Sequence, residues 1–243
     1  MIAQLYYKEL TNVLEKINGT QTSKILNAAG MVSDTIMKDG IIYIFGCGHS
    51  HLIALDSFYR AGGLANVSAM LDTDLMLHNG AAKSSVMEKV SGIAAAVFQR
   101  YCVTENDILI IVSTSGKNAV PVEMAQCASN KGIKTIGIVS SDYFNDTPLH
   151  ESGRLLYRSV DVYIDNCVPH GDATVQIAGC GAKMGSVSTA ASSFIVQSVI
   201  LEASAKSAAK GKLLPVYMSG NVEGGAEFNR KLIEQYLPRI KHL

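Results

Sequence analysis

Two short stretches of the 243-residue chain hold the residue types that bind an anion. Residues 45–51 read FGCGHSH, and residues 112–118 read VSTSGKN. Each comes at the end of an apolar run, so each is expected to lie where a buried strand ends. Glycines let the main chain approach a ligand closely, hydroxyl groups donate hydrogen bonds, and the amino terminus of a following helix favours negative charge. The two stretches therefore predict an anion-binding site.

The glycine spacing favours a small phosphorylated molecule over a nucleotide. Gly46 and Gly48 begin a dinucleotide-binding pattern, but His51 stands in place of its third glycine. Met70 falls where an acidic residue that binds a ribose is expected, and the second loop lacks the first glycine of the GxxxxGK(S/T) pattern. We therefore predict one bound phosphate, held by Gly48, Ser50, Ser113, Ser115, Lys117 and Asn118.

The elements that must position these loops follow from the hydrophobic pattern. The runs predicted to be strands are uniformly apolar, which indicates that they are buried on both faces of a parallel sheet. Ligands of such sheets bind at the carboxyl ends of the strands, where both loops are placed. Five strands are predicted, at 41–46, 66–71, 108–112, 134–139 and 160–165. Helices are predicted at 50–61, 86–101, 118–131, 186–210 and 225–236.

The segment before the first strand is expected to form two helices. Apolar residues recur at helical spacing over 2–17 and again over 25–36, and Asn18-Gly19 between them is typical of a helix end. This arm, residues 1–40, either packs on a partner subunit or covers its own chain, and the sequence leaves both open. Together with residues 41–243 it is expected to form a single domain.

Composition argues against several classes of partner. Lys plus Arg and Asp plus Glu number 21 each, without a basic cluster, so neither a nucleic acid nor a membrane surface is expected as a partner. No stretch approaches the roughly 20 apolar residues of a membrane span. The five cysteines form no CxxC pair and no zinc-ligand spacing. We expect reduced thiols in a cytoplasmic protein, with no metal and no other cofactor.

Several motifs, taken in order, resemble one family. GCGHS and STSGKN, each after a predicted strand, resemble the phosphate loops of the sugar isomerase (SIS) family. Five further stretches are similar to its uncharacterised phosphosugar-binding branch, which is related to phosphoheptose isomerase: FYRAGG (58–63), LMLHNGAAKS (75–84), VPHGDA (168–173), GSVSTAA (185–191) and SGNVEGGAEFN (219–229). The resemblance covers nearly the whole chain.

The resemblance implies a fold, a ligand and an assembly. The fold is α/β, a three-layer αβα arrangement with a flavodoxin-like five-stranded parallel sheet (the SIS fold), here with an added N-terminal helical hairpin. The ligand is a phosphorylated sugar, and the assembly is a homodimer or a dimer of dimers. Thr114 joins the phosphate ligands, as do Ser188 and Thr189 at the start of the long late helix. Plain capping of that helix is the alternative for the last two.

Isomerisation of a sugar through an enediol needs a base that moves a proton between C1 and C2. Phosphoheptose isomerases place a glutamate on the helix after the first loop, where this chain reads Phe58-Tyr59-Arg60, and a histidine on the late helix, where it has none. Other acid–base groups must substitute, and an ordinary structural role is the alternative for each. The catalytic candidates are His170, Glu88 and His78, and the candidate sugar contacts are His49, His51, Arg60, Asp172 and Glu223.

Two classes of function remain. The first is an enzyme, a sugar-phosphate aldose/ketose isomerase that abstracts a proton next to a carbonyl, or a related amino-sugar-phosphate etherase. The second is a binding protein that senses a phosphosugar without changing it. DNA-binding regulators of that kind carry a helix-turn-helix domain, and the 40 residues before the first strand are too few for one. We expect the enzyme.

Overall fold

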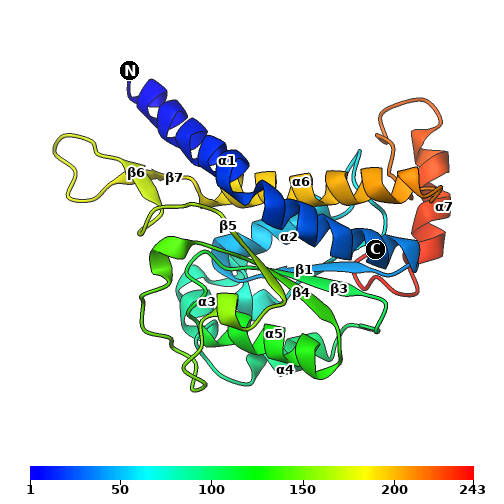
Figure 1. Ribbon diagram of the computed structural model, residues 1–243, viewed down its shortest axis with the longest axis horizontal. Helices are drawn as coiled ribbons and strands as arrows, with labels where there is room; N and C mark the ends of the chain where they lie inside the picture. The colour runs from blue at the N-terminus through cyan, green and yellow to red at the C-terminus, as the bar shows by residue number, and fades with distance from the viewer.

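Five short apolar runs form one parallel sheet in the computed structural model, which describes residues 1–243 (Figure 1). The strands pair in the order β2-β1-β3-β4-β5, the flavodoxin order, with every neighbouring pair parallel. This confirms the predicted α/β fold and its five-stranded sheet. The strands are β1 (Ile42–Gly46), β2 (Val67–Met70), β3 (Ile108–Val112), β4 (Lys134–Val139) and β5 (Val162–Asp165).

Both faces of the sheet are buried, as the continuous apolar pattern predicts. Successive side chains of a strand point to opposite faces. Ile42 and Ile44 of β1 therefore pack into one hydrophobic cluster, while Tyr43 and Phe45 pack into the other. All five residues of β1 are buried. The result is three layers, with the sheet in the middle.

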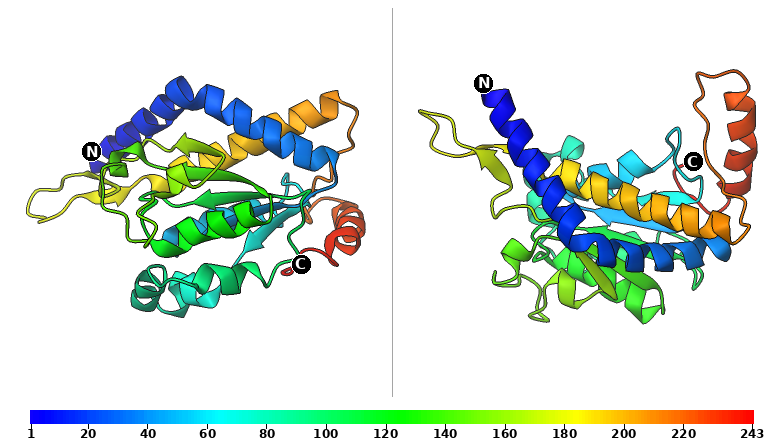
Figure 2. Two further views of the ribbon diagram at one scale, coloured as in Figure 1. Left: turned by 60° about the horizontal axis from the view of Figure 1, so that its bottom comes forward. Right: turned by 45° about the horizontal axis from the view of Figure 1, so that its top comes forward.

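Helices cover the two faces unequally (Figure 2). The long helices α1 (Ile2–Met37) and α6 (Ser188–Ala209) run together over one face, with the short α2 (His51–Ser57) beside them. The other face carries α4 (Ile93–Phe98) and α5 (Ala119–Asn130), preceded by α3 (Ala81–Met87). The last helix, α7 (Gly225–Tyr236), packs at one end of the sheet. Short 3₁₀ turns fill the loops: η1 (Gly48–Ser50), η2 (Thr73–Leu75), η3 (Leu77–Asn79), η4 (Ser141–Tyr143) and η5 (Leu156–Arg158).

The expected N-terminal helical hairpin is wrong, because α1 continues through Asn18-Gly19 as one helix of 36 residues. Two threonines make side-chain hydrogen bonds to the preceding turn there. Thr20 Oγ1 donates to Lys16 O at 2.7 Å, and Thr22 Oγ1 donates to Asn18 O at 2.5 Å. Such bonds to the preceding turn bend helices, and α1 bends in this region. Its first turns stand away from the body of the molecule (Figure 1).

Two further expectations need correction. The apolar stripe over 86–101 spans the end of α3 and all of α4, because Gly92 between them is left-handed, with φ at 90°, and its N–H donates to Glu123 Oε2 at 2.8 Å. The sequence reading also missed the antiparallel hairpin of β6 (Ala173–Val175) and β7 (Met184–Ser186). Strands of three residues are too short to show a period.

The remaining sequence expectations concern thiols and membranes. All five cysteines are free, and Cys47 is buried, with the pKa of its thiol raised by that burial. Its role is therefore that of a small apolar side chain under the first loop. No helix of this fold has both the length and the apolarity to cross a bilayer.

Candidate functional site

The two loops predicted to bind an anion leave the sheet side by side. They follow β1 and β3, which are neighbours, and Gly46 pairs in register with Val112. The strand order reverses at this point, since β2 lies on one side of β1 and the other strands lie beyond β3. The chain then enters α2 on one face of the sheet and α5 on the other. Ligands of open parallel sheets bind in the crevice that this reversal creates.

A small pocket, here called the loop pocket, lies at this crevice; it has about 10 Å³ of free volume and is partly open to solvent. Both predicted loops contribute to its wall, and so does the amino-terminal end of α6. Five of its eight lining residues carry hydroxyl groups. The lining consists of His49, Ser50, Ile53, Val112, Thr114, Ser188, Thr189 and Ser192.

The second loop presents backbone donors as well. The N–H groups of Thr114, Ser115, Lys117 and Asn118 donate no hydrogen bond within the protein. Gly116, with φ at 60°, turns the chain between them, and its own N–H donates to Ser113 Oγ at 3.3 Å. Free amides in a turn that leads into a helix make a concave site for an anion. The buried Ser113 hydroxyl therefore braces the loop through its oxygen.

Asn166, just after β5, ties the second loop to α6. It is fully buried, and its Nδ2 donates to Thr114 Oγ1 at 3.2 Å and to Ser192 Oγ at 3.3 Å. Its Oδ1 accepts from Val168 N at 3.3 Å. Two walls of the loop pocket, the second loop and α6, are thus held together by one side chain, which was not predicted from the sequence.

Asp172 caps α6. Its Oδ1 accepts from the N–H groups of Val187 at 3.0 Å and Ser188 at 2.8 Å, and its Oδ2 accepts from Ser188 Oγ at 2.7 Å. Asp172, which was expected to contact a sugar, is therefore the residue that caps α6, and it engages the Ser188 hydroxyl. Thr189 makes no such bond and remains on the pocket wall.

The loop pocket continues into a second depression, here called the α2–α6 groove. The two share Ile53 and Thr189, and the groove, about 570 Å³, is also lined by Tyr6, Leu52, Asp56, Ser186, Ala190 and Ser193. Asp56 is the one carboxylate on either wall. Its Oδ2 accepts from Ser193 Oγ at 2.9 Å, and its Oδ1 pairs with Arg60. Arg60, a predicted sugar contact, is thus an ion-pair partner.

Asp56 was not predicted as a site residue, because it lies two residues before the FYRAGG motif and outside every motif of the family resemblance. Its spacing carries a signal: Ile53 and Asp56 are three residues apart in α2, so they share one face of that helix. That face is the wall of the groove.

Comparisons with known proteins place this architecture in a family. The model of the SIS domain matches residues 5–140. The chain belongs to the SIS domain family. It is 41% identical over 243 residues to a UPF0309 protein of Caldanaerobacter subterraneus subsp. tengcongensis, covering 98% of this chain and 99% of the relative. A UPF0309 protein of Brucella anthropi is 37% identical over 242 residues, covering 100% and 99%.

Solved structures share the SIS fold. A phosphoheptose isomerase from Neisseria gonorrhoeae superposes with a TM-score of 0.53 at 18% identity, covering 87% of this chain and 97% of that one. A phosphoheptose isomerase from Francisella tularensis gives 0.53 at 16% identity, covering 83% and 95%. At these identities the likeness concerns the fold.

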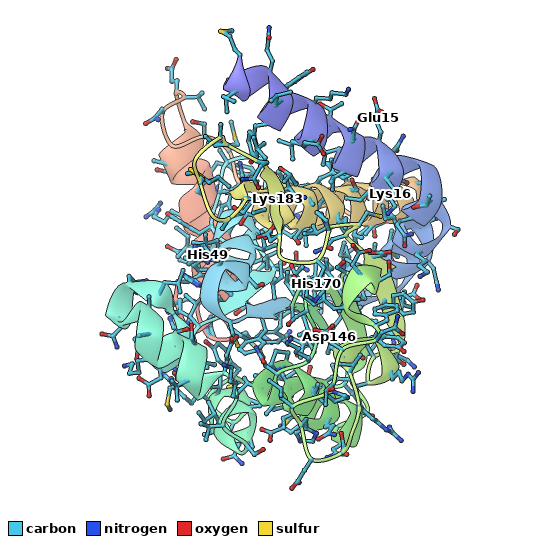
Figure 3. The ribbon with its side chains drawn as sticks, turned by 90° about the vertical axis from the view of Figure 1, so that its left-hand side faces the viewer. Glu15, Lys16, His49, Asp146, His170 and Lys183 are labelled. Atoms are coloured by element: carbon cyan, nitrogen blue, oxygen red, sulfur yellow. The ribbon has the colours of Figure 1, made fainter.

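The SIS domain places His170 on one flank of the loops, away from the pocket walls. The exposed ring stacks on Tyr143 with centroids 4.3 Å apart, and its Nε2 lies 3.4 Å from Asp146 Oδ1 (Figure 3). Asp146 also pairs with Lys117 Nζ at 2.8 Å, and these two neighbours lower the pKa of its carboxyl. Lys117, expected to face a phosphate, is therefore engaged in an ion pair beside the second loop.

Glu88 lies behind the second loop of the SIS domain and lines neither depression. Burial raises the pKa of its carboxyl, and a hydrogen bond with the Asn118 side chain partly opposes that shift. Its backbone oxygen accepts from Val120 N at 3.1 Å. Glu88 is therefore half-buried rather than solvated, and it supports the loop that Asn118 ends.

Of the other three predicted histidines, one supports the first loop and two are exposed. His51 is buried; its Nδ1–H donates to Gly48 O, and burial lowers the pKa of its ring. His78 is exposed, with its ring centroid 6.0 Å from that of His51. His49 is exposed and lines the loop pocket. Glu223 is exposed in the loop before α7, and that helix lies at the end of the sheet away from the loops (Figure 1).

Proposed function

We propose that this SIS domain binds a phosphorylated sugar and interconverts its aldose and ketose forms. The phosphate binds in the loop pocket, against the free amides of the second loop and the hydroxyl groups of Ser50, Thr114 and Thr189. The observation that carries the proposal is the continuity of this pocket with the α2–α6 groove, whose wall holds the carboxylate of Asp56. A sugar chain that leaves the phosphate through the groove passes that carboxylate.

Asp56 is the proposed base. It removes the proton from C2 of the aldose, next to the carbonyl carbon, and the electron pair forms the enediol with C1. The carboxyl group exchanges this proton with solvent, and delivery of a proton from it to C1 gives the ketose, while delivery back to C2 regenerates the aldose. Ser193 and Arg60 fix the orientation of the carboxylate through their hydrogen bonds. The exposed His49, on the wall of the adjoining pocket, is the proposed group that exchanges protons with the sugar oxygens.

One observation favours a binding protein that does no chemistry. Asp56 already has two partners within the chain, Arg60 and Ser193, and a base must release at least part of that network to work. An etherase remains the second enzymatic candidate, since it begins with the same proton abstraction. The experiment below separates these alternatives.

The proposal is tested by proton NMR in deuterated water with a panel of hexose, heptose and amino-sugar phosphates. We expect deuterium at C2 of one sugar with the natural protein. Asp56→Asn should reduce that exchange by about 100-fold or more while the sugar still binds, because the phosphate contacts remain. Asp34→Asn, an equivalent change at an exposed carboxylate on α1, is the matched control and should exchange normally.

Each other outcome has a clear meaning. Line broadening of one sugar without exchange in the natural protein supports the binding protein. Loss of an ether-linked substituent supports the etherase. Undiminished exchange in Asp56→Asn contradicts the role of Asp56 as base.

We also infer that two copies associate through α1 and α6, in the cytoplasm. The supporting observation is a set of exposed apolar side chains on these helices: Ile2 at 50%, Leu5 at 50%, Tyr7 at 70% and Leu201 at 65%. Isolated apolar residues are ordinary on surfaces, but several on two adjacent helices favour a contact. Light scattering of Leu201→Glu, expected to give the monomer mass where the natural chain gives a dimer, tests this. The five free thiols suit a reducing compartment.

A further inference from the structure

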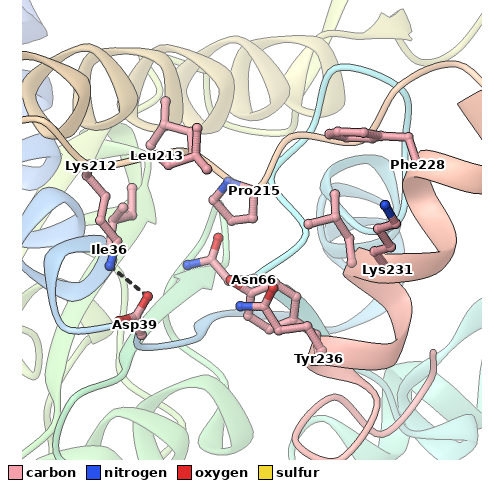
Figure 4. A pocket seen from close by; sticks show the side chains of 12 residues that line it. Ile36, Asp39, Asn66, Lys212, Leu213, Pro215, Phe228, Lys231 and Tyr236 are labelled. Carbon is pink, nitrogen blue, oxygen red and sulfur yellow. Dashed lines mark hydrogen bonds and ion pairs between the residues drawn. The ribbon is translucent and has the colours of Figure 1, made fainter.

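A second cavity, here called the α7 pocket, lies at the amino-terminal edge of the sheet, opposite the loops. It encloses about 370 Å³ between the end of α1, the segment that joins α6 to α7, and α7 itself (Figure 4). No residue of it lines the loop pocket or the α2–α6 groove. Most of its wall is apolar, formed by Ile36, Leu214, Pro215, Phe228, Leu232 and Tyr236.

One buried polar group at this pocket has no partner. Asn66 is 2% exposed, and its Nδ2 donates to Gly40 O at 2.8 Å. Its Oδ1 is closed off from water and accepts no hydrogen bond. An unpaired buried oxygen of this kind is costly, and most such atoms in proteins find a donor. Asn66 lines the α7 pocket, so a small shift of its side chain would bring Oδ1 into contact with a donor held there.

The charges at the pocket favour an anion. Lys212 Nζ pairs with Asp39 Oδ1 at 2.7 Å, which offsets the one carboxylate on the wall (Figure 4). Lys231 on α7 also lines the pocket, and it forms no ion pair within the chain. An anionic group near the rim would therefore meet a lysine without a competing carboxylate partner.

We propose that the α7 pocket binds a small aromatic acid that carries one N–H or O–H group. The aromatic body packs against Phe228, Pro215 and Tyr236, the acid faces Lys231, and the donor pairs with Asn66 Oδ1. The volume lies within the range of small-molecule sites, roughly 300–1,000 Å³, and such sites combine apolar walls with a few polar groups that fix orientation. This binding is independent of the sugar chemistry proposed for the other edge of the sheet.

Indole-3-acetate is a probe with all three features, and naphthalene-1-acetate matches it in shape but lacks the N–H. Isothermal titration calorimetry on the full chain should detect indole-3-acetate and give an affinity about tenfold weaker for naphthalene-1-acetate, because Asn66 Oδ1 then stays unpaired. Lys231→Glu should weaken indole-3-acetate about fivefold. Arg230→Glu, at the adjacent position on α7 but outside the pocket, is the matched control and should bind normally.

Phe228→Ala keeps the test independent of charge. This side chain is 45% exposed, so its loss should leave the fold intact while it weakens indole-3-acetate about tenfold. Binding that responds to Lys231→Glu and Phe228→Ala but not to Arg230→Glu supports the proposal. The proposal is overturned if indole-3-acetate does not bind at millimolar concentration, if the two pocket variants bind it normally, or if naphthalene-1-acetate binds equally well.

Discussion

The two edges of the sheet carry opposite kinds of cavity. The loop pocket at the carboxyl edge is small and lined mostly by hydroxyl-bearing residues, next to free backbone amides. The α7 pocket at the amino edge is larger and mostly apolar, with one buried acceptor left unpaired. Of these two pockets, the smaller is therefore the one with the donors for a phosphate. Donor geometry, rather than volume, assigns the sugar phosphate to the carboxyl edge.

The difference follows from the topology. At the carboxyl edge the neighbouring strands β1 and β3 run into loops that open toward the same crevice, and the helices that follow begin there. Backbone N–H groups at helix starts have no partner within the helix, so they remain available to an anion. At the amino edge the segment after α6 and the helix α7 form the walls, and they contribute mainly apolar side chains. One edge thus suits an anion, and the other suits an apolar body.

The largest expected effect is that of Gly46→Ala at the carboxyl edge, which should impair phosphosugar binding and leave the α7 pocket unaffected. A Cβ at Gly46 would lie 2.6 Å from the backbone C and O of Ser50, so the first loop must shift. We expect phosphosugar affinity to fall by about tenfold or more, because the shift misaligns hydrogen-bond donors of the loop. Calorimetry should show indole-3-acetate binding unchanged.

Gly19→Ala is the control for that substitution. Nothing lies within 4 Å of the position of its Cβ, and it stands inside α1. Both ligands should bind normally, and the free energy of unfolding should rise by up to about 1 kcal/mol. Unchanged phosphosugar binding in Gly46→Ala would argue that the first loop does not hold the phosphate.

Two buried asparagines, one at each pocket, differ in how fully their side chains are hydrogen-bonded. Asn166 makes three hydrogen bonds at the loop pocket, whereas Asn66 makes one with its side chain at the α7 pocket, where its Oδ1 is unpaired. Asn166→Ala should lower the free energy of unfolding by about 2–4 kcal/mol, and Asn66→Ala by about 1 kcal/mol. Urea unfolding monitored by circular dichroism measures both. An equal or larger loss for Asn66→Ala would mean that its oxygen has a partner in solution.

The strands and both loops could be predicted because their signals are local. An apolar run followed by glycines and hydroxyls is visible within ten residues, and the parallel arrangement then brings the loops together. The break at Asn18-Gly19 was a local signal too, but packing along the sheet and α6 keeps α1 helical. Packing by an amphipathic face outweighs the small helix penalty of one glycine, about 1 kcal/mol.

The key side chains of the site were harder to predict from the sequence. Asp56 meets Ser193 at a separation of 137 residues, and Asn166 meets Thr114 at a separation of 52. No local pattern encodes these contacts, since they depend on how α6 and β5 lie beside the first strands. For Asp172, the sequence indicated a position at the carboxyl edge of the sheet, and the residue lies there. Its carboxylate, however, accepts hydrogen bonds from the N–H groups at the start of α6.

The smallest expected effect concerns Glu88, whose carboxyl is half-buried behind the anion-binding loop. Burial raises its pKa in the folded state above the ordinary value of 4.5, so the folded protein binds the proton more tightly than the unfolded chain does. The stability gained from that proton is fully present below pH 4.5 and is lost as the pH rises through the folded pKa. Glu88→Gln carries no charge at any pH and avoids this loss.

The melting temperature of Glu88→Gln relative to the natural protein should therefore rise between pH 4 and pH 8, by about 1–3 °C for a partly exposed group in a chain of this size. Glu234→Gln, at an exposed position on α7, is the matched control and should show no such trend. A relative melting temperature that falls with pH would mean that the charged carboxylate stabilises the fold, through its hydrogen bond with Asn118. The second loop would then depend on a negative charge directly behind it, which conflicts with a phosphate bound on its other side.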